Sequence, residues 1–193
     1  MSEKTAILFD IGRFRSADGP GIRTILFFKG CPLRCRWCSN PFGLAARPQL
    51  AVNREKCTGC GMCEKVCSHG VNTVVPGERV TVNFSACVQC GACVTLCAAK
   101  ARMIAGKAYT AQQLYREAAK DAAFYRKGGG GVTLSGGEVL LQHEVAAETL
   151  RLCRANYINT CIETSAFAPW EQLWAVAQHC NTVFVGLKAM DSG

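Results

Sequence analysis

The sequence is poor in charged residues, which make up 19% of its 193 positions, whereas apolar residues make up 49%. This balance excludes general disorder, because enough apolar surface is available to form a core. No apolar run approaches the roughly 18 residues that a membrane span needs. The apolar run near the N-terminus, at 6–9, ends at Asp10 and is too short for the core of a signal peptide. We therefore expect a cytoplasmic protein with no membrane partner.

Runs of lysine and arginine are also missing, although the formal net charge is +8. A nucleic-acid-binding face concentrates basic side chains and interleaves them with aromatic ones, and the sequence shows neither pattern. Metal-bound cysteines are thiolates, so loading the cysteine groups described below with iron and sulfide would lower the charge to about +3. We therefore expect no nucleic-acid partner.

The sequence is rich in one residue type, because it has 14 cysteines. Without an export signal their thiols stay reduced, and clustered thiols then hold metal more often than they form disulfides. Eight of them form two C-x2-C-x2-C-x3-C runs, at Cys57, Cys60, Cys63 and Cys67 and again at Cys87, Cys90, Cys93 and Cys97. Two zinc sites are the alternative, although zinc usually takes pairs of C-x2-C knuckles.

This spacing is that of the bacterial two-cluster ferredoxins, in which the fourth cysteine of each run ligates the other cluster. It predicts one [4Fe–4S] cluster on Cys57, Cys60, Cys63 and Cys97, and a second on Cys67, Cys87, Cys90 and Cys93. The proline that usually follows the fourth cysteine is replaced by Ser68 and Ala98, which removes no ligand.

A third group, Cys31, Cys35 and Cys38, has the spacing C-x3-C-x2-C. It supplies three ligands, so a four-iron cluster here keeps one iron open. An open metal position can bind a substrate directly, as it does in catalytic zinc sites.

Apolar patterning predicts an α/β fold in which residues 54–104 are inserted into a domain formed by 1–53 and 105–193. Strands are expected at 24–28, 132–134, 158–163 and 182–187, and their alternation with helices indicates parallel pairing. A helix is expected from Thr110, which forms a capping box with Gln113, to about Lys127. Two more are expected at about 142–156 and from Pro169 to about 180. The other three cysteines, Cys153, Cys161 and Cys180, are expected in the core.

Several motifs occur in order around the third cysteine group. Residues 18–24 read DGPGIRT, 28–31 read FKGC, Asn40-Pro41 follow Cys38, and 130–138 read GGVTLSGGE. Together these motifs resemble the radical S-adenosylmethionine (SAM) superfamily and, within it, the glycyl-radical-enzyme activating enzymes with a ferredoxin-like insert. The resemblance covers essentially the whole chain and implies a partial (β/α) barrel of about four βα units out of six.

The resemblance also implies a site. Cys31, Cys35 and Cys38 would hold a catalytic [4Fe–4S] cluster whose open iron binds SAM, which gives three clusters in all. The other residues implied to contact SAM are Trp37 near the adenine, Gly136, Gly137 and Glu138, the pair Glu163 and Thr164 near the methionine, and Lys188. For Trp37 the alternative is ordinary packing, and for Glu163 it is a solvated carboxylate at a strand end.

The activity implied by the resemblance begins with one electron from flavodoxin or ferredoxin. SAM is cleaved reductively to methionine and a 5′-deoxyadenosyl radical, which takes a hydrogen atom from a backbone glycine of a partner glycyl radical enzyme, of the pyruvate formate-lyase kind. The protein contributes chelation, orientation and exclusion of competing reactions.

The sequence departs from the family pattern in three places. Val139 stands where proline is common, and Gly186 stands where an Asp-x-Lys motif would place aspartate before Lys188. Four strands instead of six lead us to expect a fragment, a truncated gene product or half of a split protein. An iron–sulfur electron-transfer protein and an inactive remnant that binds the partner enzyme are therefore the alternative functions.

Overall fold

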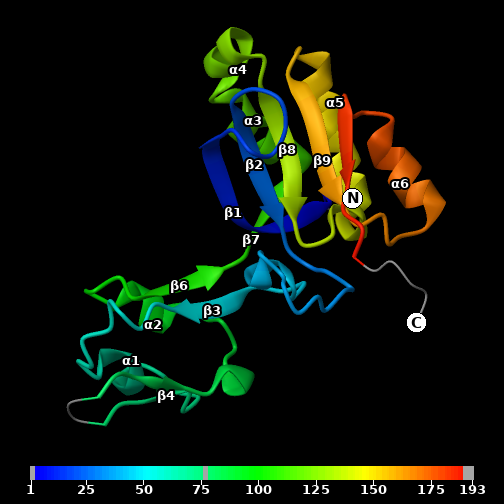
Figure 1. Cartoon of the computed structure of the whole chain (residues 1–193). Helices are drawn as coiled ribbons and strands as arrows, with labels where there is room; N and C mark the ends of the chain where they lie inside the picture. Colours follow the sequence, from blue (N-terminus) through cyan, green and yellow to red (C-terminus); the bar gives the residue numbers. More distant parts are fainter. Residues whose placement is uncertain (1–2, 76–77, 189–193) are drawn as a thin grey trace. The chain divides into compact units, whose positions relative to one another are not determined.

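The computed structural model describes residues 3–75 and 78–188, and the chain divides into two units (Figure 1). The first unit comprises Met1–Arg47 and Gly106–Gly193, and the second is Pro48–Ala105. The insert was predicted to begin at residue 54. It begins earlier because the strand β3 (Gln49–Val52) pairs with β6 (Arg102–Ala105) at the other end of the insert.

The first unit contains a six-stranded sheet with the order β10-β9-β8-β2-β1-β7. The four predicted strands are present as parallel neighbours, with bounds of β2 Arg23–Phe28, β8 Gly131–Gly136, β9 Asn159–Thr164 and β10 Thr182–Val185. β2 and β8 are buried along nearly their whole length. β10 ends before the predicted residue 187.

Two strands of this sheet were not predicted, and they make it mixed. β1 (Thr5–Arg15) pairs antiparallel with β2, and β7 (Lys107–Thr110) pairs antiparallel with β1. β1 alternates buried and accessible residues only in part, because its pairing with β2 shifts register at two points. The expected four-stranded sheet is therefore extended by two strands beyond β2.

The helices of the first unit are α3 (Ala111–Ala119), α4 (Ala122–Gly128), α5 (His143–Ala155) and α6 (Trp170–Ala177). The capping box is confirmed, since the Gln113 amide donates to Thr110 Oγ1 at 3.3 Å and the Thr110 amide donates to Gln113 Oε1 at 2.9 Å. The single helix predicted to Lys127 is wrong, because Asp121 interrupts it. The Asp121 carboxylate accepts hydrogen bonds from Thr24 Oγ1 at 2.6 Å and from Arg13, so this residue is held toward the sheet. Pro169 precedes α6 as its N-cap instead of lying in its first turn.

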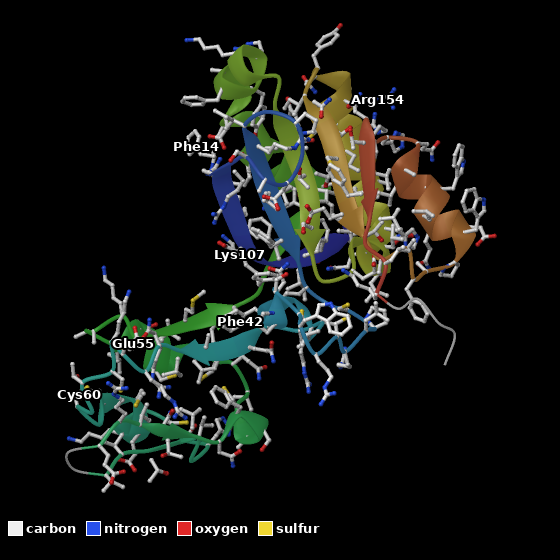
Figure 2. All side chains as sticks on the ribbon, in the orientation of Figure 1. Phe14, Phe42, Glu55, Cys60, Lys107 and Arg154 are labelled. Atoms are coloured by element: carbon white, nitrogen blue, oxygen red, sulfur yellow. The ribbon has the colours of Figure 1, made fainter. Side chains whose placement is uncertain are left out.

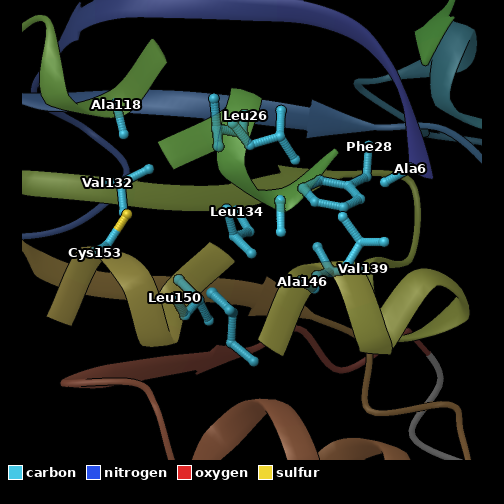
Figure 3. Close-up of a cluster of buried hydrophobic side chains, with 14 of the residues drawn as sticks. Ala6, Leu26, Phe28, Ala118, Val132, Leu134, Val139, Ala146, Leu150 and Cys153 are labelled. Atoms are coloured by element: carbon cyan, nitrogen blue, oxygen red, sulfur yellow. The ribbon is translucent and has the colours of Figure 1, made fainter. Parts of the chain in front are cut away.

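The core lies between the sheet and these helices (Figure 3). Leu26, Phe28, Val132 and Leu134 pack from the strands against Leu150 and other apolar residues of the helices. Of the three cysteines expected in the core, Cys153 and Cys161 are fully buried, and Cys180 is half-buried and packs against the core. The core therefore fixes the strands whose ends carry the predicted site residues.

The second unit repeats one local structure. Each cysteine run contains a one-turn helix, α1 (Met62–Lys65) or α2 (Ala92–Thr95), preceded by a glycine with positive φ, Gly61 at 75° and Gly91 at 81°. A short hairpin, β4 (Asn72–Thr73) and β5 (Thr81–Val82), completes the unit. Short 3-10 turns lie at Phe84–Ala86 in this unit and at Pro41–Gly43 and Val139–Gln142 in the first unit. Within the described ranges of both units, no helix is long and apolar enough to cross a membrane.

Candidate functional site

A cavity of about 300 Å³ lies at the carboxyl ends of the four parallel strands. This is the edge where open α/β sheets bind ligands, because the loops that leave neighbouring strands meet there. The cavity brings together Cys31, Cys35, Trp37, Cys38, Gly136, Gly137, Glu138, Glu163, Thr164 and Lys188. Every residue predicted for the catalytic cluster and for SAM therefore borders one cavity of the first unit.

The cysteine loop after β2 is tied down at its start. The Gly30 amide donates to Gly43 O at 2.8 Å and the Cys31 amide donates to Leu44 O at 3.2 Å. The buried side chain of Lys29 donates to the carbonyl of Phe42. The turn at Pro41–Gly43 thus folds back onto the end of β2, and the three cysteines lie between these anchored ends.

Gly136 and Gly137 are required by close backbone packing. Gly136 has a φ of +108°, and a Cβ on Gly137 would lie 2.3 Å from Gly30 O and 2.6 Å from Gly43 O. The family resemblance implies that these glycines contact SAM. The structure adds a second reason, since they let the loop after β8 pass beside the cysteine loop.

Glu138 connects the ends of two strands. Its carboxylate is buried and accepts hydrogen bonds from Thr164 Oγ1 at 2.6 Å, Ser165 Oγ at 2.6 Å, and the amides of Ser165 at 2.9 Å and Leu140 at 3.1 Å. Four donors occupy both oxygens, so the side chain holds the β8 and β9 loops together. A contact between Glu138 and SAM stays a prediction. Ser165 was missed, and its place directly after a strand end was the signal that could have found it.

Glu163 is half-buried at the cavity and accepts a hydrogen bond from Ser135 Oγ at 2.5 Å. This hydrogen bond ties its carboxylate to β8, and its contact with SAM stays a prediction. Ser135 lies in the motif of residues 130–138 but was not selected as a site residue. Its hydroxyl joins adjacent strands in the same way as the contact between Glu138 and Thr164.

Lys188 takes up the space beside Gly186. A Cβ on Gly186 would lie 2.8 Å from Lys188 Nζ, and the Gly186 amide donates to Thr164 O at 2.8 Å. The cavity wall thus presents an amine where the family motif would also project a carboxylate. Trp37 borders the cavity with 70% of its surface exposed, which disfavours the alternative of ordinary packing.

The surroundings of Cys31 are electrostatically unfavourable for a free thiolate. Burial raises the pKa of the Cys31 thiol, and the negative charges of Glu138, Cys35 and Cys38 raise it further. A bound cation reverses this balance, because metal binding stabilises thiolates and releases their protons. The donor set therefore fits a group that brings positive charge.

The cysteines of the second unit, among them Cys60 (Figure 2), surround two small cavities. One is bordered by Cys57, Cys60, Cys63 and Cys97, and the other by Cys67, Cys87, Cys90 and Cys93, with Cys93 also bordering the first. These groups have the same members as the predicted ligand sets, and the ligand roles stay predictions. Across residues 3–75 and 78–188, no three His, Cys, Asp or Glu side chains converge closely enough to hold one metal ion.

Backbone amides make parts of these cavities suitable for thiolates. Amides of Val80 and Gly59 lower the pKa of Cys57, and amides of Val71 and His69 lower that of Cys67. Two buried polar atoms of the described part of the chain lack a hydrogen-bond partner, Asn72 Oδ1 and Arg102 Nη2, and both side chains border these cavities. Unpaired buried polar atoms beside cysteine-lined cavities fit sites built around a further polar group.

Three family models match the chain. Residues 85–192 match the radical SAM superfamily, residues 56–101 match the 4Fe-4S dicluster domain, and residues 17–56 match the 4Fe-4S single cluster domain. The second and third matches contain the three cysteine groups described above. The first spans more than half of the chain.

Curated relatives are similar along nearly all of this chain. It is 41% identical to the choline trimethylamine-lyase activating enzyme of Oleidesulfovibrio alaskensis, over 100% of this chain and 63% of the relative. The (2S)-3-sulfopropanediol dehydratase activating enzyme of Klebsiella oxytoca is 39% identical, over 96% of this chain and 60% of the relative. The trans-4-hydroxy-L-proline dehydratase activating enzyme of Clostridioides difficile is 43% identical, over 90% of this chain and 58% of the relative. The chain therefore spans about three fifths of the length of these relatives.

Proposed function

The chain belongs to the radical SAM superfamily, and we propose that it acts as a glycyl-radical-enzyme activating enzyme. The observation that carries this proposal is the single cavity at the strand ends. It joins the cysteines of C-x3-C-x2-C to the Gly-Gly-Glu loop after β8, to Glu163 and Thr164 of β9 and to Lys188 after β10. The names of the relatives support the same activity.

In this proposal Cys31, Cys35 and Cys38 hold the catalytic [4Fe–4S] cluster. The cluster and SAM, when bound, supply a 5′-deoxyadenosyl radical by one-electron reduction. Glu163 and Lys188 border the cavity with opposite charges, which complement a ligand that carries both an amino group and a carboxylate. The contacts of Glu138 with Thr164 and Ser165 keep the loops after β8 and β9 in place around that ligand.

The second unit would hold two auxiliary clusters, one on Cys57, Cys60, Cys63 and Cys97 and one on Cys67, Cys87, Cys90 and Cys93. Its cysteines offer a route for electrons from flavodoxin or ferredoxin. The four parallel strands of the first unit would form the partial (β/α) barrel that the family resemblance implies. Their consecutive order and the cavity at their carboxyl ends support this arrangement.

The partner would be a glycyl radical enzyme. The names of the relatives favour a choline trimethylamine-lyase or a dehydratase over the pyruvate formate-lyase kind suggested by the motifs. We therefore place choline trimethylamine-lyase first among the candidate partners.

The proposal is tested by 5′-deoxyadenosine formation. The chain is reconstituted anaerobically with iron and sulfide, reduced, and given SAM, and nucleoside release is measured by chromatography. We expect release from the natural chain, none from Cys31→Ala, and undiminished release from Cys180→Ala, whose thiol packs against the core away from the cavity. Iron loading without any 5′-deoxyadenosine would refute the activase and leave an electron-transfer protein.

The partner is tested separately, by electron paramagnetic resonance of a glycyl radical. The reduced chain and SAM are incubated with choline trimethylamine-lyase, a dehydratase or pyruvate formate-lyase. A radical signal with the first and not the third supports the order given above. A signal only with pyruvate formate-lyase reverses it without affecting the proposed chemistry.

A further inference from the structure

A buried arginine stands beside the cysteines of the second unit. Arg102, at the start of β6, is only 6% exposed, and its Nη1 donates to Cys93 Sγ at 3.4 Å. Its Nη2 has no hydrogen-bond partner, and no ion pair within the described part of the chain includes this side chain. A buried guanidinium without a carboxylate is costly unless another negative group compensates its charge.

The position of Arg102 relates it to both cysteine groups. Its side chain borders the cavity of Cys57, Cys60, Cys63 and Cys97, whereas its hydrogen bond goes to Cys93 of the other group. Pairing of Arg102 with Val52 across β6 and β3 fixes the backbone at this point.

We propose that Arg102 is a positioning residue that raises the reduction potential of the auxiliary cluster bound by Cys93. This inference rests on the auxiliary pair of the proposed function. Reduction adds one electron from the external donor and makes a cluster more negative, so a fixed positive charge stabilises the reduced state more than the oxidised one. A hydrogen bond to a ligating sulfur acts in the same direction. Arg102 thereby makes this cluster easier to reduce.

The test is a potentiometric titration followed by electron paramagnetic resonance on the reconstituted full chain. It is repeated in a Cys31→Ala, Cys35→Ala, Cys38→Ala background, which isolates the auxiliary signals. We expect Arg102→Met to lower the midpoint potential of one auxiliary cluster by about 59 mV. This corresponds to a tenfold change in the equilibrium constant of a one-electron reduction. Arg102→Lys keeps the charge and should shift the midpoint less. Arg54→Met removes an exposed arginine of the same unit and should shift nothing.

Iron and sulfide counts separate the two possible failures. If the natural chain loads no auxiliary cluster, the proposed pair of auxiliary clusters is refuted, and this inference is refuted with it. Full loading with an unchanged midpoint in Arg102→Met overturns this inference alone. If Arg102→Met does not load, Arg102→Gln keeps two donors without the charge, and an unchanged midpoint in that variant overturns the inference instead.

Discussion

The Glu138 carboxylate accepts a hydrogen bond from the Thr164 hydroxyl at 2.6 Å, and both residues are buried. The contact connects the loop after β8 to the last residue of β9, two segments that are far apart in the sequence. The cavity wall therefore depends on a polar link as well as on the apolar core.

Replacing Glu138 tests this link. Glu138→Gln places an amide donor among groups that are themselves donors, so we expect a loss of about 2 kcal/mol in the free energy of unfolding. Chemical denaturation followed by circular dichroism measures it. Glu144→Gln is the matched control, because Glu144 forms an exposed pair with Lys4 and should leave the midpoint unchanged. Equal midpoints for the two variants would contradict the structural role of Glu138.

Gly137 should tolerate no side chain. Gly137→Ala would put a Cβ 2.3 Å from Gly30 O, so the cysteine loop or the β8 loop must move. We expect reduced iron binding at the Cys31 site and loss of 5′-deoxyadenosine formation. Gly128→Ala is the control, since a Cβ there meets nothing closer than 3.7 Å and alanine favours the helix. Normal loading and activity in Gly137→Ala would show that the close approach is not required.

Stability should fall at high pH in part through one tyrosine. Burial raises the pKa of Tyr125 to about 12, and its hydroxyl donates to Ala118 O at 2.9 Å. The unfolded chain loses this proton near pH 10 and the folded chain near pH 12, so the stabilisation is full below pH 10 and is lost between these values. The loss is on the order of 3 kcal/mol.

The measurement is the difference in unfolding free energy between the natural chain and Tyr125→Phe from pH 8 to pH 12. Burial also raises the pKa of Cys153 and Cys180 to about 12, so both proteins should lose stability above pH 9. The difference in unfolding free energy between the natural chain and Tyr125→Phe should narrow above pH 10, because only the natural chain carries a hydroxyl here that can ionise. A difference that stays constant with pH would refute the assignment to Tyr125.

Removing iron should unfold the second unit selectively. Its buried apolar residues are few and mostly small, so its stability should depend on metal ligation. They are Leu50, Ala51, Val71, Val80, Ala101 and Ala105. Hydrogen exchange of the chelated and the reconstituted chain should show loss of protection within Pro48–Ala105 and little change in β2 and β8. Unchanged protection of the insert after chelation would show that its own packing is sufficient.

Features that depend on local spacing could be predicted from the amino-acid sequence. Two repeated cysteine runs predicted the ferredoxin-like insert, and the capping box at Thr110 and Gln113 marked the start of α3. Alternating apolar segments predicted the four parallel strands. In that arrangement loops after successive strands meet at one edge, which is why the predicted site residues border one cavity.

Features that depend on contacts between distant segments could not be predicted from local patterns. The expected helix is divided into α3 and α4 next to Asp121, whose carboxylate is held by Thr24 and Arg13, and nothing in the helical pattern shows this. The carboxylate of Glu138 accepts hydrogen bonds from Thr164 and Ser165, which lie at the end of the neighbouring strand. The carbonyl oxygen of Gly30 leaves no space for a side chain at Gly137. Local patterns carry backbone preference and burial, whereas long-range hydrogen bonds and close approaches exist only after the strands have paired.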